Sequence, residues 1–408
     1  MKILHTADWH LGKRLEKFSR LEEQKLVLEE IIEIANTQEV DIVLIAGDLY
    51  DAFNPPAEAI DLFYKTLKRL TNNGKRAVIA IAGNHDSPDR IEAPDPLARE
   101  CGIFFSGYPD THIADGKLDN GIAVLRSEAG FLELKIPKYN YPLRLLLTPY
   151  ANEFRLKTFL GINNEEAELR QVLQQQWQTL ADTYCDNKGV NMLMAHLFLM
   201  KKNGIKPTEP EDEKPILHLG GAQEIYSQNI PLQMQYVALG HLHRYQVIDE
   251  KPCPIVYCSS PLSYSFAEAQ QQKYVVVLDV EPNGLPANIT KIELKQGRVL
   301  HRKKFNDINE ALIWLQQNPY TLVELTIVTT DYLTAENRKQ LLNAHNGIIT
   351  IIPEIKNINN AVADIKSINL NQNIEELFID FFKHQKGQNP NTELLDLFKE
   401  IRAQSNAE

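Results

Sequence analysis

Short apolar runs alternate with longer amphipathic stretches over roughly the first hundred residues. Three short segments are predicted to be strands, and they span 2–7, 41–46 and 76–82, of which 41–46 is almost continuously apolar. Apolar residues recur at near-helical spacing between these runs, over 20–38 and from Pro55-Pro56 to residue 71. This β-α-β-α-β order predicts parallel strands joined by helical crossovers, and therefore an α/β fold.

The pattern changes beyond residue 100, where the strand-like runs become shorter and more closely spaced. They lie at 102–106, 122–126, 130–136, 143–149, 190–195, 236–239, 254–258 and 274–280. A long helical stretch at about 164–183 interrupts them, and the charged, proline-rich segment 201–218 predicts a mobile surface loop. We expect two packed sheets with helices on the outside.

A second unit is predicted to begin near Glu281, and a helical tail ends the chain. Strands and helices alternate in the second unit, over 289–295, 308–317, 321–329, 334–344 and 348–353. The Asn-rich stretch after it predicts a linker, and apolar residues at helical spacing then predict two short amphipathic helices. The predicted division is 1–280, 281–356, a linker at 357–373, and a two-helix tail at 374–408.

Composition narrows the class of protein without identifying a function. The 408 residues suffice for two or three domains, and 43% hydrophobic with 24% charged residues is ordinary for a globular protein. The sequence contains no apolar run long enough for a membrane span and no signal region at its start, so we expect a cytoplasmic protein. The four cysteines form no Cys-x-x-Cys pair and are expected to be reduced. A net charge of −11 argues against a protein that binds nucleic acid through a generally basic surface. It does not exclude local contacts between a few basic residues and DNA.

Five short polar motifs follow five of the predicted strands. They read Asp8-Trp9-His10, Gly47-Asp48, Gly83-Asn84-His85-Asp86, Ala195-His196 and Gly240-His241-Leu242-His243. In α/β sheets the carboxyl ends of the strands form the ligand site, so we expect these side chains to converge. Their carboxylates, amide and imidazoles are enough to bind two metal ions. Each motif taken alone can have a purely structural role, such as an Asx turn or a buried histidine, whereas the five together favour metal binding.

The sequences of two motifs suggest how each could bind a metal ion. Asp8 and His10 alternate past Trp9, so in an extended strand end both point the same way and can bind one ion. Asp48 follows a glycine that permits a tight turn, and a carboxylate there can bridge two ions.

The motifs, in this order and with these flanks, resemble those of the calcineurin-like metallophosphoesterases. Within that superfamily they are most similar to SbcD-type nuclease subunits of the bacterial SbcCD complex. The segments that carry the resemblance are 5–12, 46–51, 82–88 and 240–243, and the specific motifs cover the first 260 residues. The resemblance implies a four-layer αββα sandwich with a small α+β capping domain and a C-terminal helical tail that binds a partner.

The resemblance also assigns residues to roles. It implies that the first metal is bound by Asp8, His10, Asp48 and His243, and the second by Asp48, Asn84, His196 and His241. His85 would be catalytic, facing the phosphate to protonate the leaving oxygen or to stabilise charge. Archaeal and eukaryotic relatives carry a second histidine where this chain has Asp51, so that role is not transferred. Imidazole and oxygen ligands without thiolate suit Mn, Fe or Zn, and the family implies two Mn²⁺ ions.

The implied function is cleavage of DNA by a Mn²⁺-dependent nuclease. The family acts as an ATP-dependent double-strand exonuclease and single-strand or hairpin endonuclease in DNA end processing, replication and recombination. Its partner is an SbcC-type coiled-coil ATPase, bound through the C-terminal helices, and a homodimer within a heterotetramer is implied. The tail helices have the alternative of folding back on the catalytic domain. Rival functions are a phosphomonoesterase or cyclic-nucleotide phosphodiesterase of the same superfamily, and a non-catalytic scaffold.

Basic residues near the motifs are candidates for DNA contact. They are Lys13 and Arg14 after the first motif, Arg90 after the third, and Arg302 and Lys303 in the predicted second unit. Lys17 and Arg20 belong to the first group, and residues 291–304 are rich enough in lysine and arginine to predict a basic stripe. Each group has the alternative of being a solvated charged face.

Overall fold

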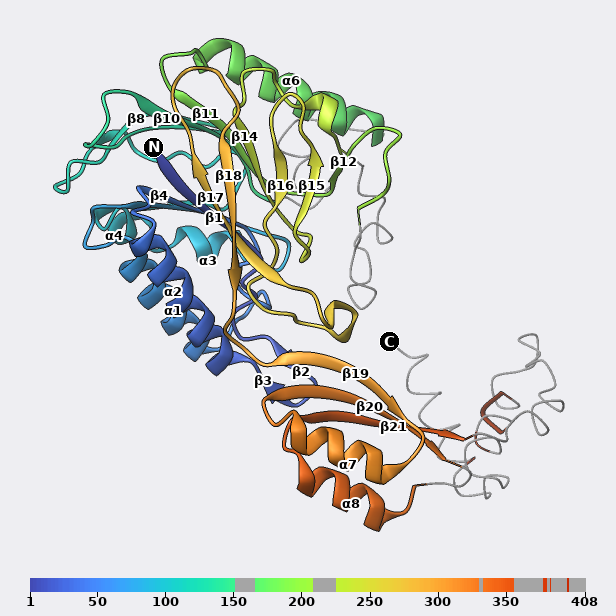
Figure 1. Cartoon of the computed structure of the whole chain (residues 1–408). Coiled ribbons are helices and arrows are strands. Elements are labelled where there is room, and N and C mark those ends of the chain that lie inside the picture. Colours follow the sequence, from blue (N-terminus) through green and yellow to red (C-terminus); the bar gives the residue numbers. More distant parts are fainter. Residues whose placement is uncertain are drawn as a thin grey trace.

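The computed structural model describes residues 1–150, 166–207, 225–329 and 333–355, together with 377–379, 382 and 395 (Figure 1). The predicted loop 201–218 lies largely outside the described residues. The predicted linker and nearly all of the two-helix tail also lie outside them.

Six strands form the first sheet, in the order β18-β17-β1-β4-β5-β6. They are β1 (Lys2–Thr6), β4 (Ile42–Ala46), β5 (Ala77–Ile81), β6 (Ile103–Ser106), β17 (Lys273–Asp279) and β18 (Asn288–Leu294). The first four are parallel, as the β-α-β-α-β order predicts, and β17 and β18 extend the sheet antiparallel. Every residue of β4 and β5 is buried, as expected for strands covered on both faces.

Eight strands form the second sheet, in the order β15-β16-β14-β11-β10-β9-β8-β7. They are β7 (Gly116–Lys117), β8 (Ala123–Glu128), β9 (Phe131–Lys135), β10 (Pro142–Thr148), β11 (Val190–His196), β14 (Tyr236–Gly240), β15 (Gln246–Asp249) and β16 (Ile255–Tyr257). The strands β10, β11, β14 and β16 are parallel. The two sheets pack face to face, since Leu44 of β4 and Met192 of β11 are fully buried in one shared core.

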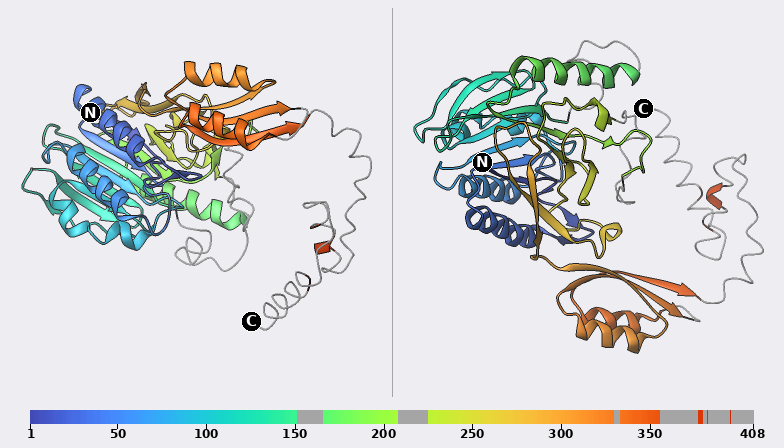
Figure 2. Two further views of the ribbon diagram at one scale, coloured as in Figure 1. Left: turned by 90° about the horizontal axis from the view of Figure 1, so that it is seen from below. Right: turned by 45° about the horizontal axis from the view of Figure 1, so that its top comes forward.

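Helices cover the outer face of each sheet, which completes four layers. The helices α1 (Leu21–Thr37) and α2 (Ala57–Leu70) bury Ile31 and Phe63 against the first sheet. On the second sheet, α6 (Glu166–Tyr184) buries Trp177. Figure 2 shows α6 and the α1–α2 pair on opposite outer faces of the sandwich. The predicted αββα arrangement is confirmed.

Short elements connect these layers. They are the strands β2 (Arg14–Leu15), β3 (Phe18–Ser19), β12 (Leu199–Met200) and β13 (Ile225–Tyr226), the helices α3 (Pro88–Glu92) and α4 (Asp95–Glu100), and the 3-10 turns η2 (Ser227–Asn229) and η3 (Phe266–Glu268).

A separate three-stranded parallel sheet follows the sandwich (Figure 1). Its strands are β19 (Val299–Phe305), β20 (Thr321–Thr329) and β21 (Ile348–Ile355), and its helices are α7 (Ile308–Gln317) and α8 (Ala335–Ala344). The helices share a hydrophobic core with one face of this sheet. On the other face, Leu300 and Leu322 pack with Leu15 and Phe266 of the sandwich.

The strand predicted at 289–295 belongs to a different sheet from the one expected. It is β18, which pairs antiparallel with β17 at the edge of the first sheet. The strand that begins the small unit is β19, which the prediction missed because its centre, His301 to Lys304, is polar and lacks the apolar pattern of a buried strand. We therefore propose a domain boundary between β18 and β19 in place of residue 281.

The cysteines and the helices bear on two predictions made from composition. All four cysteines are unpaired, and Cys185, Cys253 and Cys258 are buried, which fits reduced structural thiols. Across the described ranges, no helix has both the length and the apolar character needed to cross a bilayer.

Candidate metal centre

The five polar motifs lie together at one end of the sandwich, where strands of both sheets end. The first sheet contributes residues that follow β1, β4 and β5, and the second contributes the end of β11 and the segment after β14. The residues brought together are Asp8, His10, Asp48, Asn84, His85, His196, His241 and His243. The side chains of Asn84, His85 and His241 are partly exposed, whereas the other five are buried. The predicted convergence is therefore present in the structure.

Three glycines of the motifs allow this close approach. A Cβ atom on Gly83 would lie 2.1 Å from the Asp48 nitrogen, and one on Gly47 would lie 2.2 Å from His196 Nδ1. At Gly240 the Cβ would lie 1.8 Å from the Ala46 carbonyl oxygen. Any side chain at these positions would push the neighbouring segments apart. Gly47 and Gly240 thus keep the two sheets in contact at the site, and Gly83 keeps the loops after β4 and β5 together.

The backbone after β1 differs from the prediction. Asp8 and His10 do not alternate along an extended strand, because β1 ends at Thr6 and both residues are left-handed, with φ of 54° and 45°. Hydrogen bonds hold this conformation: Asp8 N–H donates to Gly47 O at 3.0 Å, and His10 N–H donates to Asp48 O at 2.9 Å. The two side chains still reach one cluster with His243. Backbone strain of this kind costs about 1–3 kcal/mol per residue and is concentrated at functional sites.

One half of the cluster brings together two imidazoles and two carboxylates. The Nε2 atoms of His10 and His243 are 3.0 Å apart, and Asp48 Oδ2 lies 3.5 Å from His10 Nε2. Nitrogen ligands lie about 2.0–2.1 Å from a bound metal ion, so two that share one ion approach each other to about 3.0–3.4 Å. Asp8 Oδ2 is buried and has no hydrogen-bond partner among the described residues. Such an orphaned carboxylate oxygen fits a cation at this position.

The other half is built around His196. Its Nδ1 lies 2.8 Å from the Ala46 carbonyl and donates to it, so Nε2 is the nitrogen that carries the lone pair once the imidazole is neutral. That Nε2 faces Asn84 Oδ1 at 2.9 Å and Asp48 Oδ2 at 3.4 Å, which are both acceptors. His241 Nδ1 lies 3.1 Å from the same Asn84 oxygen. Acceptors that face one another suit a shared cation, and Asp48 contacts both halves, as a bridging ligand requires.

Burial and neighbouring charges shift the protonation of these groups in different directions. Burial raises the pKa of Asp8 to about 7 and lowers the pKa of His10 to about 4. Burial alone would lower the pKa of His196, but the adjacent Asp48 carboxylate raises it to about 9. For Asp48, burial disfavours the charge, yet His196 and the other imidazoles hold its pKa well below the usual range. Clusters of buried groups with opposed shifts are typical of functional sites.

His85 lies at the open side of the cluster. Its Nδ1 is 2.8 Å from the Asp51 carbonyl oxygen, and its main-chain N–H donates to Asp48 Oδ1 at 2.9 Å. Since Nδ1 donates to the Asp51 carbonyl, Nε2 does not take part in that bond. It can accept a hydrogen bond when the ring is neutral and donate one when the ring is protonated. The Asp51 side chain is close to His10 Nδ1 at 3.6 Å and to Lys13 Nζ at 2.9 Å.

Several supporting residues were not assigned by the sequence. The Asp86 carboxylate accepts hydrogen bonds from the N–H groups of Gly83, Leu49 and Tyr50, at 2.8, 3.0 and 2.9 Å, so it ties two motif loops together. Glu268 lies 3.2 Å from His243 Nδ1, although it is distant from every motif along the chain. No local pattern marks Glu268, because its role depends on a contact that only the fold creates.

The basic candidates near the motifs differ in exposure. Arg14 and Arg90 are exposed, and Arg90 donates to Asn54 Oδ1 at 3.2 Å. Lys13 is partly buried in its ion pair with Asp51. Arg20 is fully buried, with its guanidinium 2.6 Å from Glu23 and 2.7 Å from the Ser263 carbonyl. The prediction that Arg20 meets a phosphate backbone is therefore wrong, because its charge is already paired inside the fold.

The basic candidates on β19 do not form one stripe. Successive strand residues point to opposite faces, so Arg302 and Lys303 are separated by the sheet. Arg302 Nε lies 2.8 Å from Glu324, and Lys303 Nζ lies 5.2 Å from the centre of the Trp314 ring on α7. The predicted basic stripe is thus divided and partly neutralised.

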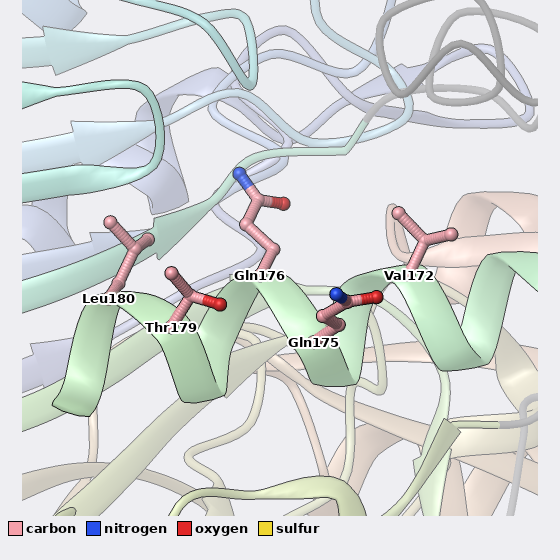
Figure 3. A pocket seen from close by; sticks show the side chains of 5 residues that line it. All are labelled: Val172, Gln175, Gln176, Thr179 and Leu180. Atoms are coloured by element: carbon pink, nitrogen blue, oxygen red, sulfur yellow. The ribbon is translucent and has the colours of Figure 1, made fainter.

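A hollow of about 290 Å³ lies along α6, away from these motifs (Figure 3). The side chains that line it within the described residues are Val172, Gln175, Gln176, Thr179 and Leu180. These five side chains include no group suited to metal binding or acid–base chemistry.

Comparison with known proteins finds similarity along nearly the whole chain. The model of the calcineurin-like phosphoesterase family matches residues 1–245. The SbcD subunit of the nuclease SbcCD from Bacillus subtilis is 34% identical over 411 residues, covering 98% of this chain and 97% of that protein. The SbcD subunit from Rhodobacter capsulatus is 31% identical, covering 71% of this chain and 69% of that protein. Among solved structures, a dimetal phosphatase from Danio rerio is similar at 12% identity, with a TM-score of 0.38 over 72% of this chain and 99% of that one.

Proposed function

This chain belongs to the calcineurin-like phosphoesterases and, within them, to the SbcD nuclease subunits, and we propose that it hydrolyses DNA phosphodiesters at a centre of two Mn²⁺ ions. The observation that carries the proposal is the convergence of five strand-end motifs on one buried cluster of carboxylates and imidazoles. Similarity over 98% of the chain favours a nuclease over a phosphomonoesterase or a cyclic-nucleotide phosphodiesterase of the superfamily.

The proposed ligands divide into two sets that share Asp48. One set is Asp8, His10, Asp48 and His243, and the other is Asp48, Asn84, His196 and His241. The orphaned Asp8 oxygen and the facing acceptors at Asn84 support this division. The mixture of imidazole and oxygen ligands suits Mn, Fe or Zn, and Mn²⁺ is proposed among them because the family resemblance implies it. When bound, two such ions supply the Lewis acidity that activates water and stabilises charge on the phosphate oxygens.

The protein side chains proposed to act on the substrate are few. His85 is the proposed catalytic residue, because it is partly exposed and its Nδ1 is held by the Asp51 carbonyl at 2.8 Å. Its Nε2 would donate a proton or a hydrogen bond to the leaving oxygen. The main-chain bond from His85 to Asp48 Oδ1 fixes this imidazole relative to the bridging carboxylate.

Contacts to the DNA backbone are proposed for basic residues around this opening. Lys13, Arg14 and Arg90 lie on segments that follow the motifs, and Arg14 and Arg90 are exposed. Arg302 and Lys303 are more distant candidates on the small unit, where a carboxylate and an aromatic ring already engage them. Phosphate contacts of this kind make binding dependent on salt concentration.

The proposed partner is an SbcC-type coiled-coil ATPase, which would make cleavage ATP-dependent. The relatives from Bacillus subtilis and Rhodobacter capsulatus are each named as one subunit of a nuclease complex, SbcCD. The predicted two-helix tail at 374–408 is the proposed attachment, with the chain forming a homodimer within a heterotetramer. The proposed activities are double-strand exonuclease and single-strand or hairpin endonuclease.

Cleavage of three substrates in Mn²⁺ tests this function. A labelled linear duplex, a DNA hairpin and nitrophenyl phosphate, each with and without the ATPase and ATP, separate the candidate activities. The proposal expects cleavage of hairpin and duplex, stimulated by ATP when the partner is present. Rapid hydrolysis of nitrophenyl phosphate with intact DNA would favour the phosphomonoesterase instead, and no hydrolysis of any substrate would favour a scaffold.

A further inference from the structure

A buried ion pair lies behind His243, on the side away from the metal cluster. Glu268, at the end of η3, is fully buried, and Lys273, at the start of β17, is 6% exposed. Glu268 Oε1 is 3.2 Å from His243 Nδ1, and Lys273 Nζ donates to Glu268 Oε2. The His243 imidazole, the Glu268 carboxylate and the Lys273 ammonium therefore contact one another in series, from the metal cluster into the core.

The partners of Glu268 determine which nitrogen of His243 carries a proton. The Lys273 ammonium and the Tyr264 main-chain N–H, at 3.2 Å, both donate to this carboxylate. An ionised carboxylate only accepts, so the hydrogen between Glu268 and His243 belongs to His243 Nδ1. A neutral imidazole has one N–H, which leaves the lone pair on Nε2. This Nε2 is the atom that lies 3.0 Å from His10 Nε2.

Lys273 restrains both ends of the same histidine. Its ammonium also donates to the His243 carbonyl oxygen at 2.8 Å and to Ser260 Oγ at 2.9 Å. The backbone of His243 is thus fixed directly, and its ring is fixed through Glu268. A buried ion pair is weak evidence for stability, since apolar residues of similar volume often serve as well. The pair has a clearer use in defining the orientation and tautomer of one imidazole.

The opposite imidazole has a looser version of this arrangement. His10 Nδ1 is 3.6 Å from Asp51 Oδ1, which is beyond hydrogen-bond distance, and Asp51 is paired with Lys13 at 2.9 Å. Both side chains of that pair are about a quarter exposed, at 25% and 24%. Of these two imidazoles, His243 is therefore the one whose carboxylate partner is both hydrogen-bonded and excluded from water.

We propose that Glu268 and Lys273 are positioning residues that keep His243 in its Nδ1–H tautomer, with Nε2 available to bind a metal ion. The inference rests on the proposed function only in taking His243 as a ligand, and it is independent of the substrate. Hydrogen-bond partners of this kind typically change metal affinity by about 10–100-fold when they are altered.

Glu268→Gln in the full-length chain tests the proposal through Mn²⁺ binding without DNA. The charged Lys273 donor should attract the amide oxygen more strongly than the neutral Tyr264 N–H does, which turns the NH₂ group toward His243 Nδ1 and leaves that N–H without its acceptor. His243 then has to accept there and carry its proton on Nε2. We expect one of two Mn²⁺ affinities, measured by calorimetry, to fall about 10–100-fold, while the other changes less than about threefold. Long-range ¹H–¹⁵N spectra should show one imidazole changing from Nδ1–H to Nε2–H.

A second substitution separates tautomer control from general loosening. In Glu268→Gln/Lys273→Met, the amide oxygen is free to turn back to Nδ1, so we expect part of the lost Mn²⁺ affinity to return. It should stay below the wild-type value, because the His243 carbonyl also loses its Lys273 donor. Asp41→Asn is the matched control, because Asp41 is 7% exposed, lies 2.9 Å from Lys138 Nζ and precedes β4 at the end away from the motifs. It should leave both affinities unchanged.

Defined outcomes contradict the proposal. Unchanged Mn²⁺ affinities in Glu268→Gln, an equal loss at both sites, or no recovery in the double variant would overturn it. If Glu268→Gln does not fold, Glu268→Asp keeps the charge but withdraws it from Nδ1, and the loss at one site is then the result expected. A wild-type chain that binds two Mn²⁺ ions but cleaves no DNA would refute the nuclease proposal and leave this one standing.

Discussion

Asp8 shows at the scale of one residue why the cluster suits a cation. Its backbone is left-handed, its buried Oδ2 atom has no hydrogen-bond partner in the described part of the chain, and burial raises its pKa to about 7. A strained backbone and an unsatisfied buried oxygen each cost about 1–3 kcal/mol. A folded protein retains such costs where function requires them, and a divalent ion beside Asp8 would offset them.

His85→Ala should separate catalysis from metal binding. The His85 imidazole is proposed to meet the leaving oxygen, so its loss should lower the rate of DNA cleavage by about 10²–10⁴-fold. Binding of two Mn²⁺ ions, measured by calorimetry, should persist because His85 is outside both proposed ligand sets. His112→Ala is the control, since His112 is an exposed histidine outside the motifs. Full cleavage by His85→Ala would show that another group serves the leaving oxygen.

Metal binding should release protons near pH 7. Burial raises the pKa of Asp8 to about 7, and the Asp48 carboxylate raises the pKa of His196 to about 9 against the effect of burial. Both groups therefore carry protons before the ion binds and must lose them, so affinity should rise as pH increases from about 6 to 9. Calorimetry at pH 7 in two buffers of different ionisation enthalpy should report between about one and two protons released. Heats that are independent of the buffer would contradict this.

At the scale of elements, the site depends on loops that follow parallel strands. The carboxylate of Asp86 joins the loops after β4 and β5 through three main-chain N–H groups. Asp48, Asn84 and His85 all lie in these two loops. One buried side chain therefore stabilises the loops that carry two of the proposed ligands and the proposed catalytic residue.

Asp86→Ala should loosen both loops together. Three buried N–H groups would lose their acceptor, and each such loss costs about 1–3 kcal/mol, so we expect the free energy of unfolding to fall by about 3–5 kcal/mol. Denaturant unfolding measures this loss, and Mn²⁺ affinity should fall with it. Asp110→Ala provides an exposed carboxylate as a control. A change below about 1 kcal/mol would mean that the loops are held by other contacts.

Most of the elements could be predicted from the sequence, and the exceptions have physical causes. The helix at 308–317 and the strand at 321–329 match the prediction, because their apolar residues follow a regular period. The polar strand β19 lacked that period, and the sheet to which β18 belongs depends on pairing that a single strand does not encode. The motifs revealed the site, whereas Glu268 and the left-handed backbone of Asp8 and His10 arise only from tertiary contacts.

At the scale of the whole molecule, the catalytic sandwich and the attachment of a partner are proposed to be separate. Five motifs of the sandwich form the proposed metal centre, and the proposed partner-binding tail lies in a different part of the chain. The small unit contacts the sandwich near the site, through Leu300 and Leu322 against Leu15 and Phe266. This contact holds the small unit against the sandwich.

Deletion of residues 372–408 should abolish the complex but spare the site. The amphipathic helices predicted there are the proposed anchor for the coiled-coil ATPase, and they contribute no proposed ligand. Co-purification with the ATPase should be lost, while Mn²⁺-dependent cleavage by the isolated chain should remain within about threefold of the full-length value. Retained co-purification would place the partner interface elsewhere.

Five strand ends are proposed to form one centre for two metal ions. Crystals of the full-length chain grown with Mn²⁺ test it by anomalous diffraction at the manganese edge. We expect two peaks bridged by Asp48, one also bound by Asp8, His10 and His243, and the other by Asn84, His196 and His241. A single peak, or peaks away from these residues, would contradict it.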